Sequence, residues 1–152
     1  MKQHGNHENG PAGFSLPELL IVVAILTIIT TFAVQGFARI QKEWSLLGSA
    51  RMLETSLHWG RMRAITSNAP VLFEIEENGR GFMWRDPATG NILETTARSI
   101  NKGSLIVSSP RTPLRFYPRG NAVPSGTYTI EGETGSYSVV VAPGGRIRLQ
   151  KN

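Results

Sequence analysis

The feature that most constrains this chain is its longest apolar stretch, residues 16–34, near the amino-terminal end. Glu18 is the only acidic or basic residue in it. Thr27, Thr30 and Thr31 cost little there, because a helical threonine can donate to a carbonyl one turn earlier. About 20 apolar helical residues cross a hydrocarbon core of ~30 Å. The stretch therefore predicts a membrane-spanning helix, and the ionisable Glu18 inside it is interpreted as functional.

A short motif opens this apolar stretch: Gly13, Phe14, Ser15, Leu16 and, after Pro17, Glu18. The motif resembles the class III signal of type IV pilins and pseudopilins. The resemblance implies that a prepilin peptidase cuts after Gly13 and methylates the new amino-terminal Phe14. It also implies that Glu18, the fifth residue of the mature chain, pairs with the terminal amine of a neighbouring subunit during filament assembly.

Pro17 stands where this family more often has an aliphatic residue. A helical proline removes a donor and collides with the carbonyl four residues earlier, which here belongs to Gly13. Once Phe14 is the terminus, Pro17 lies among the first four positions, whose N–H groups have no helical partner. We hypothesise that Pro17 is harmless in the mature helix but keeps the scissile bond of the precursor extended.

The resemblance also implies a topology. Residues 1–13 are predicted to be a cleaved leader on the cytoplasmic side, and residues 14–36 to be the transmembrane half of the helix. The protein would be a single-pass protein of the inner membrane with its carboxy-terminal head in the periplasm, and would then enter a pilus or pseudopilus. The alternative is an ordinary signal peptide that is cut after the apolar run, near residues 34–36.

The helical pattern continues as an amphipathic segment over residues 37–68 and ends at Asn68, Ala69 and Pro70. The predicted apolar stripe consists of Ile40, Trp44, Leu47, Ala50, Leu53, Leu57, Gly60 and Ala64. The opposite, charged side carries Arg39, Lys42, Glu43, Arg51, Glu54 and Arg61. Each glycine costs a helix about 1 kcal/mol relative to alanine, so Gly36, Gly48 and Gly60 are expected at bends or where a neighbouring backbone approaches closely.

Residues 69–152 read as a β-rich globular head. Strands are predicted over residues 71–76, 81–85, 92–96, 105–107, 114–117, 127–130, 136–141 and 146–149, with a tight turn at Asn78-Gly79. The head holds too little apolar material for a large core of its own, so the amphipathic helix must supply one wall. The predicted fold class is α+β, with a long amino-terminal helix packed on a carboxy-terminal antiparallel β domain.

A second resemblance lies in the head. Residues 116–120, the valines at 139–141 and the Gly-Arg-x-Arg pattern from Gly145 to Arg148 are similar to the carboxy-terminal half of the GspH/FimT family. That family comprises minor pseudopilins of type II secretion systems and minor pilins of type IV pili. The favoured role is a minor pilin at or near the tip of a type IV pilus. The alternatives are a GspH-type minor pseudopilin and a periplasmic β-domain with an ordinary signal or anchor.

Positive charge is concentrated in the carboxy-terminal third. Residues 14–97 carry seven Lys and Arg against eight Asp and Glu, whereas residues 98–152 carry eight against two. This asymmetry favours an acidic partner, namely nucleic acid, anionic lipid or an acidic protein face. The competing interpretation is a solvated surface that keeps the protein soluble.

Arg146 and Arg148 flank Ile147, and residues two apart on a strand share a face. Both guanidinium groups are therefore expected to point one way, where they would suit successive phosphates. In the family, the Gly-Arg-x-Arg pattern is associated with DNA binding in minor pilins of the FimT type. These pilins act in competence, which is the uptake of DNA. The predicted contacts to double-stranded DNA are Arg115, Arg119, Arg146, Arg148 and Lys151. Alternatively, arginines on an edge strand protect against edge pairing.

Nothing in the sequence predicts catalysis. Two of the three histidines lie in the predicted leader, and His58 has neither a second histidine nor a cysteine to complete a metal site. The Gly-x-Ser-x-Gly and Gly-Lys-Ser/Thr motifs are missing from the sequence. We expect no enzyme activity, catalytic residue, metal, cofactor or small-molecule substrate. The expected partners are other pilins or pseudopilins, prepilin peptidase, inner-membrane lipid and DNA.

Overall fold

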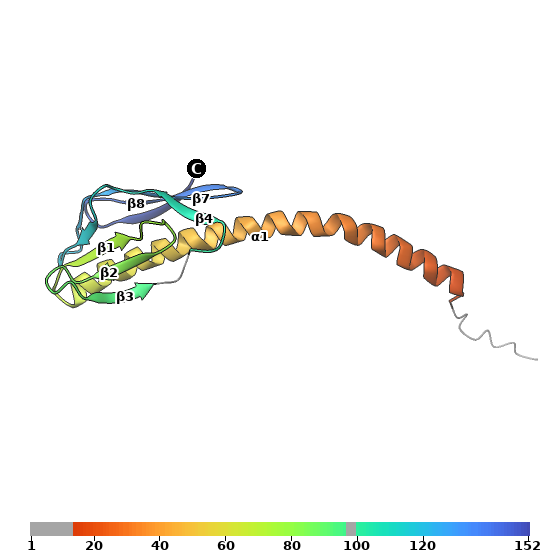
Figure 1. Cartoon of the computed structure of the whole chain (residues 1–152), viewed down its shortest axis with the longest axis horizontal. Helices are drawn as coiled ribbons and strands as arrows, with labels where there is room; N and C mark the ends of the chain where they lie inside the picture. The colour runs from red at the N-terminus through yellow and green to blue at the C-terminus, as the bar shows by residue number, and fades with distance from the viewer. Residues whose placement is uncertain (1–13, 97–99) are drawn as a thin grey trace, which may run out of the picture. The chain divides into compact units, whose positions relative to one another are not determined.

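The computed structural model describes residues 14–96 and 100–152. By its internal contacts the chain divides into two compact units, Met1–Ala38 and Arg39–Asn152. Helix α1 (Leu16–Thr66) begins in the first unit and ends in the second (Figure 1). The predicted leader over residues 1–13, including Gly13, lies outside the described residues.

In the first unit, α1 begins just before the proline. The helix begins at Leu16, so Pro17 takes its second position. No hydrogen bond is lost there, because the first four N–H groups of a helix have no partner within it. The N–H of Leu19 donates to the carbonyl of Ser15 at 3.2 Å.

The three threonines of this unit confirm the prediction that they bond back to the helix. The hydroxyl groups of Thr27, Thr30 and Thr31 donate to the carbonyl four residues earlier, at 2.8, 2.6 and 2.9 Å. The large apolar side chains around them are exposed in this single chain, for example Ile25 and Ile29. Among the residues that the structure describes, no helix combines the length and the hydropathy that a membrane crossing requires.

The second unit contains two antiparallel sheets (Figure 1). One sheet has the strand order β3-β2-β1-β5-β6 and the other β4-β7-β8-β9. The strands are β1 (Val71–Ile75), β2 (Phe82–Arg85), β3 (Ile92–Thr96), β4 (Ser104–Ser108), β5 (Leu114–Phe116), β6 (Ala122–Val123), β7 (Gly126–Gly132), β8 (Gly135–Val141) and β9 (Ile147–Lys151). The α+β prediction is thereby confirmed, and each predicted strand has a counterpart. Only β6, two residues long, was not predicted.

Within the second unit, α1 buries one side in four- and three-residue steps. The buried side consists of Leu46, Ala50, Leu53, Leu57, Gly60 and Ala64. The predicted stripe was wrong at its beginning, because Ile40 and Trp44 are 53% and 67% exposed. Residues 39–44 are all exposed, and burial of the helix begins only at Ser45, so the buried stripe starts later than predicted. The helix ends at Thr66, two residues before the predicted end.

An aromatic cluster forms the core between α1 and the sheets. Trp84 of β2 is fully buried, with its ring centroid 4.9 Å from that of Phe73 and 6.1 Å from that of Phe116. Its indole N–H donates to the hydroxyl of Ser56 on α1 at 2.8 Å. Gly60 makes room for the ring, since a Cβ there would lie 2.1 Å from the nearest ring carbon. The close approach predicted at Gly60 is therefore made by a side chain and not by a backbone.

Candidate functional site

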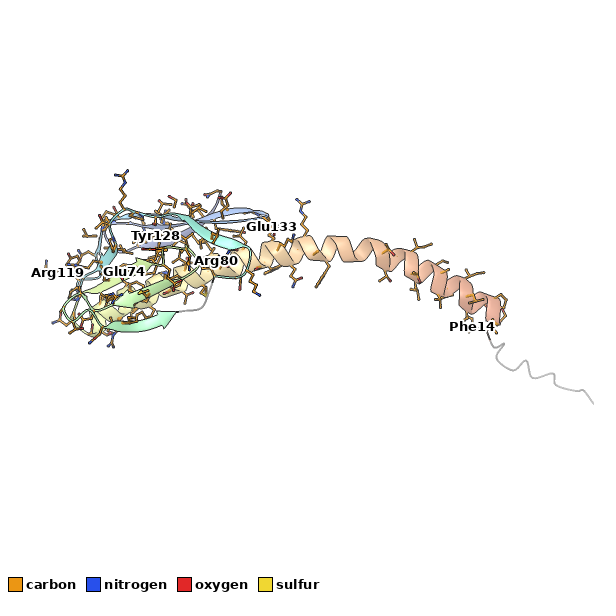
Figure 2. The ribbon with its side chains drawn as sticks, in the orientation of Figure 1. Phe14, Glu74, Arg80, Arg119, Tyr128 and Glu133 are labelled. Atoms are coloured by element: carbon orange, nitrogen blue, oxygen red, sulfur yellow. The ribbon has the colours of Figure 1, made fainter. Side chains whose placement is uncertain are left out.

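The residues of the amino-terminal motif that the structure describes are exposed at the start of α1. Figure 2 labels Phe14, which is 81% exposed. Glu18 lies in the first turn of the helix, where the helix dipole favours a carboxylate. It forms no hydrogen bond or salt bridge with any residue that the structure describes. An exposed, unpaired carboxylate on an apolar helix is available to a cation of another molecule.

The second unit brings two glycine turns together. The turn between β5 and β6 contains Gly120, and the turn between β8 and β9 contains Gly145, with φ angles of 81° and 74°. A Cβ at Gly145 would lie 1.8 Å from the carbonyl oxygen of Gly120, so only glycine fits there. The N–H of Ala122 also donates to the carbonyl of Pro143 at 2.9 Å. The two turns are in direct backbone contact, and we call the place where residues 117–122 meet residues 142–146 the glycine junction.

Arg61 of α1 reaches the same junction. Its Nε–H donates to the carbonyl of Gly120 at 3.0 Å. The side chain also borders the second turn, because a Cβ at Gly145 would lie 2.8 Å from Nε of Arg61. The sequence-based reasoning assigned Arg61 to the solvent-facing side of the helix and missed this interaction. The available signal was its position next to Gly60, which places it at the edge of the buried side.

The junction displays two of the predicted DNA-binding arginines. Arg119 immediately precedes Gly120, Arg146 immediately follows Gly145, and both side chains are exposed. Figure 2 shows Arg119 at the end of the second unit where α1 finishes. Arg146 lies in the turn, since β9 begins only at Ile147. The strand thus begins one residue later than predicted. Arg146 and Arg148 are both exposed on either side of the buried Ile147, as expected if they face the same way.

The other two predicted cations lie apart from the turns. The ammonium group of Lys151 donates to a carboxylate oxygen of Glu43 on α1 at 2.7 Å. This hydrogen bond and the positive charge of Lys151 lower the pKa of Glu43, and the same contacts raise the pKa of Lys151. Lys151 is three residues after Arg148 and so faces the other side of the strand. Arg115 is half-buried on β5.

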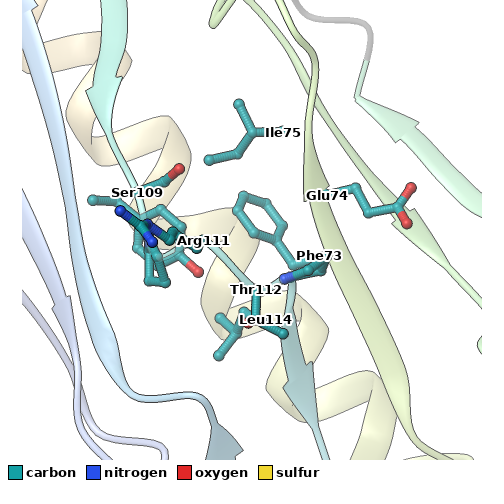
Figure 3. A pocket seen from close by; sticks show the side chains of 10 residues that line it. Phe73, Glu74, Ile75, Ser109, Arg111, Thr112 and Leu114 are labelled. Carbon is teal, nitrogen blue, oxygen red and sulfur yellow. The ribbon is translucent and has the colours of Figure 1, made fainter.

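A cleft of about 320 Å³ between the two sheets is a second candidate (Figure 3). Figure 3 shows the ring of Phe73 on β1 pointing toward Arg111, which lies in the segment before β5. Tyr128 closes the cleft on the β7 side, and burial raises the pKa of its phenol. Glu74 is occupied by a salt bridge to Arg85 at 3.1 Å. The lining residues therefore offer no acid–base pair.

The described residues offer no site for a metal ion. Among residues 14–96 and 100–152, no group of three or more His, Cys, Asp or Glu side chains lies close enough to hold one. His58 is exposed on α1. The candidate functional features are thus the start of α1 and the arginine-bearing junction of the two turns.

Comparisons with known families match both ends of the chain. The family model described as type II transport protein GspH matches residues 49–145, and the prokaryotic N-terminal methylation motif matches residues 9–34. The first match covers the glycine junction and more than half of the chain. The second covers Gly13, Phe14 and Glu18. Both resemblances drawn from the sequence are confirmed at this level.

Solved structures share the fold. The type IV minor pilin FimU of Pseudomonas aeruginosa is 19% identical, with a TM-score of 0.60, and the match covers 73% of this chain and 92% of FimU. The minor pseudopilin EpsH from the type 2 secretion system of Vibrio cholerae is 16% identical, with a TM-score of 0.58, covering 70% of this chain and 97% of EpsH. The chain has no match among curated proteins. At these identities the structural likeness concerns the fold.

Proposed function

The chain belongs to the family of type II transport protein GspH, whose members are pilin-like subunits, and we propose that it is a minor pilin of a type IV pilus. The observation that carries the proposal is the combination of the methylation motif with the GspH match in one chain. FimU, a type IV minor pilin, shares the fold, and the choice of the pilus follows the role that the sequence resemblance favours. The subunit would be assembled at or near the tip of the filament, together with other major and minor pilins.

Processing and membrane insertion are part of the proposal. A prepilin peptidase cuts after Gly13 and methylates Phe14. The mature subunit would stay in the inner membrane through residues 14–36, in contact with lipid and with its head, residues 69–152, in the periplasm. This placement is supported by the methylation motif and not by the hydropathy of the described helix. An unpaired Glu18 in that apolar environment is costly, and pairing with the terminal amine of a neighbour offsets part of the cost. This difference favours assembly over the free membrane-bound subunit.

Cleavage after Gly13 and methylation of Phe14 can be tested on the mature protein. Mass spectrometry of its amino terminus should find N-methylated Phe14. Glu18→Gln should be processed and methylated but should fail to enter filaments, because the amide cannot form the ion pair. Glu77→Gln is the matched control, since Glu77 is exposed in the head. An amino terminus near residue 35 would instead establish an ordinary signal peptide and exclude the pilin pathway.

The second candidate is a minor pseudopilin of a type II secretion system, the kind of system named in the description of the matching family model. The two systems differ in the major subunit that surrounds the protein. Crosslinking in the native host followed by mass spectrometry should recover the major pilin if the protein belongs to a pilus. Recovery of the major pseudopilin alone would assign it to secretion.

For the head we propose binding of double-stranded DNA during uptake, supported by the exposed Arg119, Arg146 and Arg148 at and beside the glycine junction. Guanidinium groups on two turns suit phosphates of a DNA backbone and carry little sequence preference. Affinity should fall steeply with salt, and the logarithmic slope should decrease by about 0.9 for each phosphate that a variant no longer neutralises. Arg115, the remaining predicted contact, is half-buried on β5.

Gel shifts of the full chain in detergent test the DNA proposal. Gln substitution at Arg119, Arg146 or Arg148 should weaken binding and reduce the salt slope. Lys151→Gln is the control, because it also removes one positive charge, but from a residue that is already paired with Glu43. If Lys151→Gln weakens binding as much as Arg146→Gln, or if the wild type does not bind, DNA contact through the turns is wrong.

A further inference from the structure

Two backbone contacts hold the two turns together. The hydrogen bond from Ala122 to Pro143 joins the backbones, and Gly145 sits directly on the carbonyl of Gly120. Each turn is closed within itself, by the N–H of Gly120 on the carbonyl of Tyr117 and by the N–H of Gly145 on that of Ala142, both at 2.8 Å. The turns are thus preformed, and what remains to be fixed is their position relative to each other.

Arg61 is placed to fix that position. Nε and Nη2 on one edge of its guanidinium group would both lie 3.3 Å from a Cβ at Gly120, so this edge faces the first turn. The Nε–H donates to the Gly120 carbonyl, the same oxygen against which Gly145 packs. The planar group therefore holds an oxygen that both turns share. Because Arg61 belongs to α1, it also ties the junction to the helix.

We propose that Arg61 is a positioning residue, which locks the two glycine turns together so that Arg119 and Arg146 are presented as one surface. The consequence for DNA rests on the proposed function of the head, whereas the locking of the turns does not. Arg61 acts through the carbonyl of Gly120 and not as a phosphate ligand. Its role needs a directional donor at Nε as well as a positive charge.

Two substitutions at this position separate positioning from direct contact. Arg61→Lys keeps the charge but replaces the rigid planar group with a single ammonium on a flexible stem. Arg61→Met removes both the charge and the donor and keeps an apolar stem. Arg63→Met is the matched control, since Arg63 is exposed two residues further along the same helix. The full chain in detergent is used for all of them.

The first readout needs no DNA. Hydrogen exchange of the Ala122 amide, which bridges the turns, should accelerate at least about tenfold in Arg61→Met and in Arg61→Lys, because hydrogen bonds to charged groups typically contribute a factor of ten or more. Arg63→Met should leave it unchanged. Unchanged exchange in Arg61→Met would overturn the proposal.

The second readout is affinity for a short DNA duplex over a salt series. Both Arg61 variants should lose about tenfold in affinity, with the salt slope of the wild type retained. Full recovery of affinity in Arg61→Lys, together with a slope reduced by about 0.9 in Arg61→Met, would make Arg61 a phosphate ligand and overturn the positioning role. If the wild type does not bind DNA, the proposed DNA function fails, and the exchange of Ala122 alone decides whether Arg61 positions the turns.

Discussion

Replacing Gly60 with alanine tests the packing of α1 against the core. In an isolated helix the change stabilises by about 1 kcal/mol, because glycine is the poorer helix former. Here the added methyl group would lie 2.1, 2.4 and 2.5 Å from three carbons of the Trp84 ring. Carbon atoms in contact stay about 3.5–4.0 Å apart. Either the ring or the helix must therefore move by more than about 1 Å.

The surroundings of Trp84 determine the size of the effect. The ring is fully buried and has Phe73, Trp59 and Phe116 as neighbours, with centroids 4.9, 5.8 and 6.1 Å away. Overpacking of such a core costs about 1–3 kcal/mol. If the shift also breaks the hydrogen bond to Ser56, a buried donor loses its partner at a further cost of about 1–3 kcal/mol. After the helix gain is subtracted, Gly60→Ala should destabilise by up to about 2 kcal/mol if the hydrogen bond is kept, and by about 1–5 kcal/mol if it is broken.

Gly48→Ala on the same helix is the control. At Gly48 the nearest atom to a Cβ is Nδ2 of Asn101 at 3.5 Å, an ordinary contact. This substitution should stabilise by up to about 1 kcal/mol. Thermal unfolding of the full chain in detergent, followed by near-ultraviolet circular dichroism of the tryptophans, measures both. A melting temperature of Gly60→Ala at or above that of the wild type would refute the packing argument.

Three further predictions use the same kind of contrast. Gly145→Ala should lower the melting temperature more than Gly90→Ala and far more than Gly144→Ala, because Gly90 and Gly145 share a positive φ but only Gly145 meets a backbone oxygen; equal losses at 90 and 145 would contradict the clash. Pro17→Ala should slow the conversion of precursor to mature protein, timed by the mass shift, and an unchanged rate would exclude a role for the proline in cleavage. The pair Glu43–Lys151 should make a small, salt-screened contribution that is present at neutral pH. It is lost below pH 4.5, as the lowered pKa of Glu43 is passed, and above pH 10.5, as the raised pKa of Lys151 is passed. Lys151→Met should abolish that pH dependence at low salt, measured by thermal unfolding, and a difference from wild type that is the same at every pH would argue against the ion pair.

Local patterns sufficed for the elements of the fold. Strand alternation and turn residues identified eight of the nine strands among the described residues, because side-chain period and turn chemistry are properties of a few neighbouring positions. The start of the buried helix stripe was missed for a different reason. A period of 3.6 residues fits Ile40 and Trp44 as well as Leu46 and Ala50, and only the reach of the sheets along α1 decides between them. β6, with two residues, is too short to show any period.

The candidate site was less predictable because its interactions join distant parts of the chain. Arg61 and Gly120 are 59 positions apart, and Lys151 and Glu43 are 108 apart. At such separations the sequence does not show which residue is the partner, even where, as for Arg61 beside Gly60, it places the side chain at the edge of the buried side. Arginines can be found by motif and charge, but which of them are free depends on their partners. Among the five predicted DNA-binding residues, only the structure shows that Lys151 is paired with Glu43. Only the structure shows that Arg61, outside that set, bonds to the turn that carries Arg119.

The ion pairs of the second unit are not spread evenly over the basic carboxy-terminal third. Toward the beginning of the second unit, Lys42 pairs with Glu133, and Glu43 pairs with Lys151. These two pairs take up one of the eight basic residues in residues 98–152 and one of the two acidic ones. Figure 2 shows Glu133 and Arg119 at opposite ends of the unit. Arg119 and Arg146 lie at the junction of the turns without an ion pair to any described residue. Two of the basic residues thus lie together where the turns meet. If Arg61 fixes the turns as proposed, a phosphate backbone there would meet arginines that are already in place.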